Sequence, residues 1–281
     1  MCRLFGFRSS VPSQVHSSLV AAENALLAQS ARHPDGWGVA FYVNDYPHLF
    51  RSHVKALEDR LFRDVSGVVS TYTLVAHVRR ATVGEVGLLN CHPFQYGNWV
   101  FAHNGEIAGF SQDPAVREAA LAEVDERFRK YIMGQTDSEI CFYAFLSRVA
   151  RTYDDVHQKG LDVEKVSDAL RRTVESMQHL GLRLAGWDGR LTFLVTNGNL
   201  MLATRNGREL HYSTYKTLCP ERETCAAYDP ARCETEVKDG IVKHLLLTSE
   251  PIKNPNVWTE LKDGEAVGVN WGMRFKRWTV D

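Results

Sequence analysis

Short apolar runs, bounded by turn-forming residues, alternate along this chain with longer amphipathic segments. Near the N-terminus, runs rich in β-branched and aromatic residues end at Gly, Pro, Asp or Asn, and they read CRLFGF, WGVAFYV, YTLVAHV and NWVFAHN. Such composition and boundaries are typical of β-strands. The pattern therefore predicts four strands, at residues 2–7, 37–43, 72–78 and 98–104.

Apolar residues spaced by about 3.6 positions predict helices between and after these strands. The predicted helices cover residues 17–31, 137–150 and 163–180. The C-terminal part returns to strand-like runs, at residues 191–197, 199–205, 242–249, 265–271 and 273–280, the first two separated by a Gly-Asn turn. Strands, helices and strands again indicate sheets layered with helices. Because neither a flexible linker nor a repeat interrupts the pattern, we expect one domain over residues 1–281.

Composition limits the function classes that this chain can serve. Its 281 residues are 44% hydrophobic, enough to bury a large core. Neither an apolar run long enough to span a membrane nor an export signal is present, so we expect a cytoplasmic protein. The 33 basic residues nearly balance the 34 acidic ones. This balance gives no electrostatic reason to expect nucleic acid or a membrane surface as a partner, and a small neutral or zwitterionic substrate fits better.

Six cysteines are spread along the chain, at positions 2, 91, 141, 219, 225 and 233. Without an export signal, reduced thiols are expected rather than a disulfide framework. Cys219, Cys225 and Cys233 fall in one polar segment, but their spacing matches no paired zinc motif and a fourth ligand is missing. We expect a surface excursion that carries incidental thiols, with a metal site as the alternative, and no cofactor.

Cys2 is a candidate nucleophile because it directly follows Met1 and opens an apolar strand. Removal of Met1 would place a thiol and a free α-amine on one residue. A thiol reacts as thiolate and needs a base, and an α-amine has a reference pKa of about 7.7–8.0, suited to that role. The alternative is that Cys2 is a small buried hydrophobe, as cysteines often are.

Polar residues that bind and stabilise a reacting amide follow the predicted strands. One strand leads into Arg79, whose guanidinium fork suits a carboxylate, and another ends at Asn104 and Gly105, a side-chain amide and an unobstructed N–H that suit an oxyanion hole. Asp137 stands at the start of a predicted helix. It is either the helix N-cap or a partner for a substrate ammonium group.

Three further side chains near these positions are predicted to be structural. His92 and His103 are expected to be hydrogen-bonded supports rather than bases, because the α-amine already supplies a base. Asp35 is expected to cap or brace its loop.

Six motifs in this order resemble the class II glutamine amidotransferases, a family of N-terminal nucleophile hydrolases: MCRLFGF, HPDGWGVAFY, HVRRATVG, NCHPF, HNGEIAGF and TDSE. The resemblance is strongest to the stand-alone, YafJ-type and γ-glutamyl amidohydrolase-like members, and the later LLLTSEPI resembles a segment of the same group. It implies an α+β fold, a four-layer αββα sandwich of two antiparallel sheets between helical layers.

The resemblance also implies a role for each candidate. Cys2 would attack the side-chain amide of glutamine or another γ-glutamyl compound and form a thioester, with Asn104 and Gly105 as the oxyanion hole. Arg79 would hold the α-carboxylate of the glutamyl group and Asp137 its α-ammonium. Thr82 would line the same pocket.

Three functions remain open from the sequence. The chain acts alone on a γ-glutamyl compound, or it delivers ammonia or a γ-glutamyl group within a complex whose partner supplies an acceptor or a synthase activity. In the third, it is a non-catalytic scaffold that retains the fold. Nothing after residue 140 offers a phosphate-binding or dinucleotide-binding motif.

Overall fold

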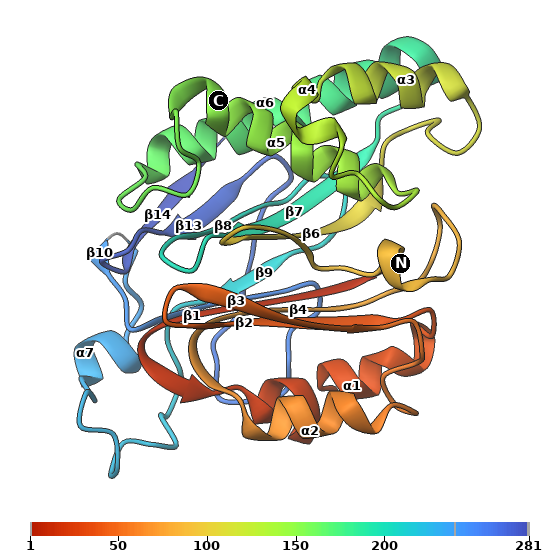
Figure 1. The fold of residues 1–281 in the computed structure, drawn as a ribbon. Helices are drawn as coiled ribbons and strands as arrows, with labels where there is room; N and C mark the ends of the chain where they lie inside the picture. The colour runs from red at the N-terminus through yellow and green to blue at the C-terminus, as the bar shows by residue number, and fades with distance from the viewer. Residues whose placement is uncertain (1, 239, 280–281) are drawn as a thin grey trace.

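Two antiparallel sheets face each other in this protein, and helices cover their outer faces (Figure 1). The computed structural model describes residues 2–238 and 240–279, and within these residues each sheet has seven strands. The first sheet has the order β12-β9-β11-β1-β4-β2-β3 and the second β10-β14-β13-β8-β7-β6-β5. The predicted four-layer α+β sandwich is confirmed.

The strands of the first sheet are β1 Arg3–Gln14, β2 Trp37–Val43, β3 Tyr46–Ser52, β4 Ser70–Val78, β9 His211–Ser213, β11 His244–Thr248 and β12 Thr259–Glu260. Those of the second sheet are β5 Phe94–Tyr96, β6 Trp99–Glu106, β7 Arg190–Thr196, β8 Met201–Thr204, β10 Gly240–Ile241, β13 Ala266–Val269 and β14 Arg274–Trp278. The helices are α1 Leu26–Gln29, α2 Arg60–Val68, α3 Pro114–Ala122, α4 Glu126–Arg129, α5 Asp137–Thr152, α6 Val163–Ala185 and α7 Pro230–Cys233. Figure 1 shows α1 and α2 against the first sheet and α3 to α6 against the second.

Strand alternation divides the buried residues into three layers. On β1, Phe5 and Phe7 pack with the residues of the α1 and α2 layer, whereas Leu4 packs between the two sheets. On β6, Phe101 packs against the α5 and α6 layer and Ala102 faces the first sheet. Because side chains alternate along a strand, residues of matching parity at the strand ends also point into the space between the sheets.

Most predicted elements agree with the structure. The four N-terminal strands form β1, β2, β4 and β6, and the two long C-terminal helical patterns form α5 and α6. The later apolar runs form β7, β8, β11, β13 and β14, although Val280, at the end of the last predicted strand, lies outside the described residues.

The helix predicted over residues 17–31 is wrong as a continuous element. A single π-helical turn at Ser17–Ala21 is followed by an extended Ala22, and α1 begins only at Leu26. The side chain of Asn24 explains the break, because its Nδ2 donates to the carbonyl of Pro251 at 2.8 Å and its Oδ1 accepts from the backbone of Lys253 at 2.7 Å. These distant contacts override the local periodicity.

Strand β3 was not predicted, because its sequence YPHLFRS is polar and contains a proline. It lies at the edge of the first sheet, where a missing N–H is tolerated. Asn44 and Asp45 join it to β2 with positive φ angles of 49° and 69°, as a tight hairpin turn requires.

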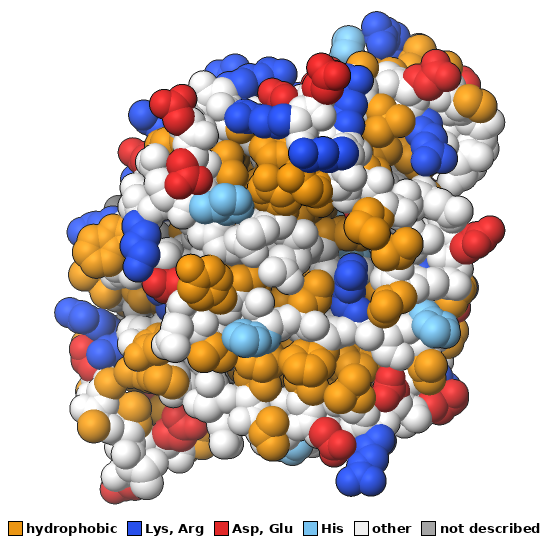
Figure 2. Space-filling model, viewed as in Figure 1, with side chains coloured by type: hydrophobic (Ala, Val, Ile, Leu, Met, Phe, Trp, Pro, Cys, Tyr) orange, Lys and Arg blue, Asp and Glu red, His pale blue; other side chains and the backbone are white. Residues whose placement is uncertain are grey.

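The surface is mixed. Figure 2 shows hydrophobic side chains in an interrupted band over the first sheet, among charged and polar ones. Within the described residues, none of the helices has the length and apolar character needed to cross a membrane.

Two buried histidines lie in contact between the sheets, with their rings tilted by 31°. The rings of His77, on β4, and His92, before β5, lie 4.3 Å apart, and none of their nitrogens has a hydrogen-bond partner among the described residues. The hydrogen bond expected for His92 is therefore absent there. Burial lowers the pKa of His77 to about 3, and burial together with His77 holds the pKa of His92 well below its ordinary value.

We expect the free energy of unfolding to fall as the pH decreases below about 6.5, the ordinary histidine pKa. Burial lowers the pKa of His77 and His244 to about 3 and that of His103 to about 4. The unfolded chain therefore takes up protons first as the pH falls, which favours unfolding. The expected loss is on the order of 2 kcal/mol for each histidine between pH 7 and pH 5.

Urea unfolding at these two pH values tests this expectation. Asp137 and Glu139 oppose the trend, because burial raises the pKa of both, that of Asp137 to about 6, but the buried histidines outnumber them. His77→Phe should weaken the pH dependence, whereas exposed His179→Gln should retain it. Equal stability of the wild-type protein at both pH values would contradict the expectation.

Candidate active site

Cys2 lies at the start of β1, with the parity of Leu4, and so faces the space between the sheets. Its Sγ lies 3.4 Å from both the backbone nitrogen and the carbonyl oxygen of Arg80. Burial raises the pKa of this thiol, so a base is needed to form the thiolate. Met1 lies outside the described residues, and its removal stays a prediction.

Arg79 follows β4 and is held in place through its backbone. Its N–H donates to the carbonyl of Gly36 at 2.7 Å, and its carbonyl accepts from the N–H of Asp35 at 3.1 Å. The Asp35 carboxylate accepts from the N–H of Ala81 at 2.8 Å, so the bracing role predicted for Asp35 is confirmed. These bonds fix the segment that contacts the Cys2 thiol.

The buried guanidinium of Arg79 organises the loop that follows it. It donates to the carbonyls of Val83 at 2.9 Å and Glu85 at 3.0 Å, and more weakly to Gly84. A guanidinium has five N–H donors, so two donors of Arg79 have no hydrogen-bond partner among the described residues. Thr82 is exposed in the same loop.

Asn90 connects this loop to the start of α5. Its Nδ2 donates to the carbonyl of Glu85 at 3.0 Å, and its Oδ1 accepts from the N–H of Gln135 at 2.8 Å. The connection ties the segment after Arg79 to the residues that precede Asp137.

Asp137 is the first residue of α5 and not its N-cap. Thr136 is the cap, since its hydroxyl accepts from the N–H of Glu139, so the N-cap alternative for Asp137 is wrong. The buried Asp137 carboxylate accepts from the N–H of Ile107 at 2.7 Å. Burial raises its pKa to about 6, while this hydrogen bond lowers it.

Asn104 and Gly105 end the buried part of β6. Asn104 has the parity of Ala102 and so faces the first sheet. Gly105 has a φ of 148°, and a Cβ added there would overlap the carbonyl oxygen of Arg190 on β7. Only glycine fits this position without strain.

Ser249 joins the two sheets beside the candidate nucleophile, and residue-by-residue reasoning from the sequence missed it. Its hydroxyl accepts from the N–H of Leu4 at 3.0 Å and from the Asn104 amide at 3.5 Å. The following Glu250 binds Arg3 at 3.0 Å and Arg32 at 3.5 Å. The resemblance of LLLTSEPI to the stand-alone group was the only sequence signal for this contact.

His103 supports the site from the helix side of β6. Its Nε2 lies 3.0 Å from the Arg190 carbonyl, which only accepts, so Nε2 carries the proton and Nδ1 accepts from the Ser138 hydroxyl at 2.9 Å. Burial lowers its pKa to about 4. The prediction that His103 is hydrogen-bonded is confirmed.

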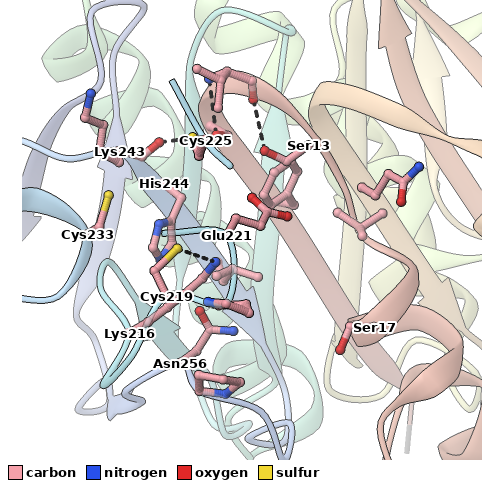
Figure 3. Close-up of a pocket in the computed structure, with 18 of the residues that line it drawn as sticks. Ser13, Ser17, Lys216, Cys219, Glu221, Cys225, Cys233, Lys243, His244 and Asn256 are labelled. Carbon is pink, nitrogen blue, oxygen red and sulfur yellow. Dashed lines mark hydrogen bonds between the residues drawn. The ribbon is translucent and has the colours of Figure 1, made fainter. Parts of the chain in front are cut away.

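The clustered cysteines lie elsewhere. Cys219, Cys225 and Cys233 line a cavity of about 170 Å³ together with His244 and Lys216 (Figure 3). Cys219 and Cys233 are buried rather than exposed, so the expected surface excursion with incidental thiols is wrong for those two. Within the described chain, no group of three or more His, Cys, Asp or Glu side chains is placed to hold a metal.

This cavity lies against the middle of β1, around Ser9, seven residues after Cys2. Because a strand rises by about 3.3 Å per residue, the two places are roughly 20 Å apart. The cysteine cluster is therefore not part of the candidate active site.

Comparison with known proteins identifies the family of this chain. The chain is 27% identical to the probable glutamine amidotransferase DUG3 of Saccharomyces cerevisiae, over 100% of this chain and 83% of that protein. It is also 27% identical to the gamma-glutamyl-hercynylcysteine sulfoxide hydrolase of Mycobacterium tuberculosis, over 84% and 75% of the two chains.

A solved glutamine aminotransferase class-II domain protein from Silicibacter pomeroyi has the same fold, with a TM-score of 0.63, 22% identity and 99% of each chain covered. The family model for class II glutamine amidotransferases matches residues 1–278. The chain therefore belongs to the class II glutamine amidotransferases.

Proposed function

We propose that this protein hydrolyses or transfers the γ-glutamyl amide of glutamine or a related γ-glutamyl compound, through a thioester on Cys2. The observation that supports it most is that four strand and helix ends meet around the Cys2 thiol, whose surroundings include the Arg79 and Asp137 side chains. These ends carry Cys2, Arg79, Asn104 with Gly105, and Asp137.

The reaction begins at the Cys2 sulfur, which bonds to the amide carbonyl carbon. Because burial raises the thiol pKa, the proton must leave during attack, and the α-amine freed by removal of Met1 accepts it. The C–N bond then breaks, and the same proton leaves with the departing amine. Water or an acceptor amine attacks the thioester and restores the thiol.

The tetrahedral intermediate carries negative charge on the former carbonyl oxygen. The Asn104 side-chain amide and the Gly105 N–H would stabilise that charge. A weak hydrogen bond of 3.5 Å to Ser249 orients the Asn104 amide relative to β1.

Arg79 and Asp137 would bind the glutamyl half. The Arg79 donors not used by its loop suit the α-carboxylate, and the buried Asp137 carboxylate suits the α-ammonium. Thr82, in the loop that Arg79 organises, would border this pocket. We propose that the matched residues form a single catalytic domain, and the cytoplasmic location stays a prediction.

Intact mass tests the nucleophile directly. Incubation with a diazo-ketone analogue of glutamine should add one adduct to a chain that lacks Met1, and Cys2→Ala should abolish the adduct. Cys91→Ala, which changes a buried cysteine before β5, is the matched control and should still be labelled. A processed chain that takes no adduct would favour the scaffold alternative.

We expect Asn104→Ala to lower kcat by a factor of about 10² to 10³, as loss of one oxyanion donor usually does. The variant should still fold, since Asn104 makes one weak side-chain hydrogen bond. Asn44→Gly, in the β2–β3 turn, should keep wild-type activity. A wild-type rate in Asn104→Ala would remove Asn104 from the mechanism.

The pH profile of kcat/KM separates the roles of Asp137 and the α-amine. Both must be deprotonated, so log(kcat/KM) should rise with slope 2 below pH 6, where Asp137 titrates with its pKa of about 6. The slope should be 1 from there to the amine pKa of about 7.7–8.0. Asp137→Asn should keep slope 1 throughout, with a raised KM, and retention of slope 2 would contradict the assignment.

A further inference from the structure

The loop between β8 and β9 folds back onto the strand that pairs with the candidate oxyanion residues. The Thr192 hydroxyl, on β7, donates to the carbonyl of Arg208 at 3.0 Å, and the N–H of Leu191 donates to the carbonyl of Asn206 at 2.9 Å. Thr192 is the cross-strand partner of Asn104. Arg208 is therefore fixed one strand away from Asn104.

The guanidinium of Arg208 has no hydrogen-bond or ion-pair partner that the described residues supply. Its side chain is half-buried, and its Nε is fully buried without a partner. Other buried or half-buried arginines have partners for their guanidinium groups. Arg3 and Arg148 pair with Glu250 and Glu123, whereas Arg8, Arg51 and Arg79 donate to backbone carbonyls. Leaving such a group unpaired costs stability, which a bound anion would recover.

The backbone of Arg208 lies beside the candidate oxyanion residue, because Thr192 contacts its carbonyl and pairs with Asn104. Burial lowers the pKa of Arg208, Arg190 lowers it further, and Glu106 and Cys2 raise it. Arg190 is an exposed arginine, and none of the described carboxylates forms an ion pair with it. The Arg208 guanidinium thus has a second arginine among its neighbours and no paired carboxylate.

The layering of the strands puts Arg208 and Arg79 on opposite sides of Cys2. In the first sheet, β1 lies between β4, which leads to Arg79, and β11. Tyr212 of β9, the strand beyond β11, stacks on Phe275 of β14, whereas Tyr42 of β2, the strand beyond β4, donates to the carbonyl of Asn98 before β6. The β8 side of the second sheet therefore lies over the β11 side of the first. The loop that carries Arg208 follows β8 and contacts β7.

We propose that Arg208 binds an acidic group on the leaving-group side of the substrate, so that this protein acts on γ-glutamyl conjugates of amino acids or peptides in preference to glutamine. This inference rests on the proposed function. The glutamyl chain and the leaving group lie on opposite sides of the scissile carbonyl. With Arg79 on the glutamyl side, an arginine on the other side of Cys2 faces the leaving group.

The chemistry of an arginine fork favours a carboxylate there, through two parallel N–H···O bonds. Ammonia, the leaving group of glutamine, offers no such acceptor. When the C–N bond breaks, the amino group of the departing amino acid takes the proton held by the Cys2 α-amine, and its carboxylate leaves Arg208 with it. A charge-assisted contact of this kind corresponds to roughly ten- to hundredfold discrimination.

The test compares γ-glutamylglycine with γ-glutamylglycinamide, which differ only in the terminal carboxylate. The wild-type protein should prefer the acid by at least tenfold in kcat/KM. Arg208→Gln should bring the ratio close to one by slowing the acid, and Arg208→Lys should restore part of the preference. Exposed Arg63→Gln, on α2, is the matched control and should keep the wild-type ratio.

Labelling of Cys2 separates this inference from the proposed function. The diazo-ketone analogue occupies only the glutamyl half of the site. The slowing of Cys2 labelling by each glycine compound therefore measures how well that compound binds, whether or not it is turned over. Better protection by the acid in the wild-type protein, lost in Arg208→Gln, supports the role of Arg208. Normal labelling with equal protection, or an equal loss for both compounds in Arg208→Gln, overturns it. Absence of labelling overturns the proposed function itself.

Discussion

The pairing of β1 on both sides is the constraint on which the rest of the structure depends. Leu4 is opposite His77 on β4, and Phe5 is opposite Thr248 on β11. Chain ends are usually loose, but this pairing fixes the first described residues in the middle of a sheet. A shift by one residue would exchange Leu4 and Phe5 between layers and turn Cys2 away from the second sheet. One register therefore sets both the core and the position of the thiol.

The side chains around this thiol have their hydrogen bonds largely satisfied by the protein, but not their charges. Three backbone carbonyls accept from Arg79, and Asp137 accepts from Ile107, so both side chains are held before any ligand binds. Burial nevertheless raises the pKa of Cys2 and of Asp137, which means that their charged forms are disfavoured until a partner arrives. Buried ionisable groups that are fixed in position but lack an opposite charge are typical of sites organised for a charged ligand rather than for stability.

Hydrophobic periodicity in the sequence predicted the secondary structure correctly where contacts between neighbouring residues determine it. Alternation predicted the strands that lead to Cys2, Asn104 and Arg79, and helical spacing predicted the start of α5 at Asp137. It failed at residues 17–31, where Asn24 bonds to a segment more than two hundred residues away. The contact of Ser249 with Asn104 and the fold-back of the Arg208 loop likewise depend on which strands become neighbours. Periodicity along the chain carries no information on those pairings.

The two sheets divide the work of recognition under the proposed function. Arg79 comes from the end of β4 in the first sheet, and its loop reaches Asp137 through Asn90. Arg208 comes from a loop that is hydrogen-bonded to β7 in the second sheet. That hydrogen bond does not involve the residues that hold Arg79. A change in the Arg208 loop would therefore alter the leaving group without disturbing the glutamyl half. Because both sides share Cys2, one nucleophile would serve different γ-glutamyl compounds through variation in a single connection.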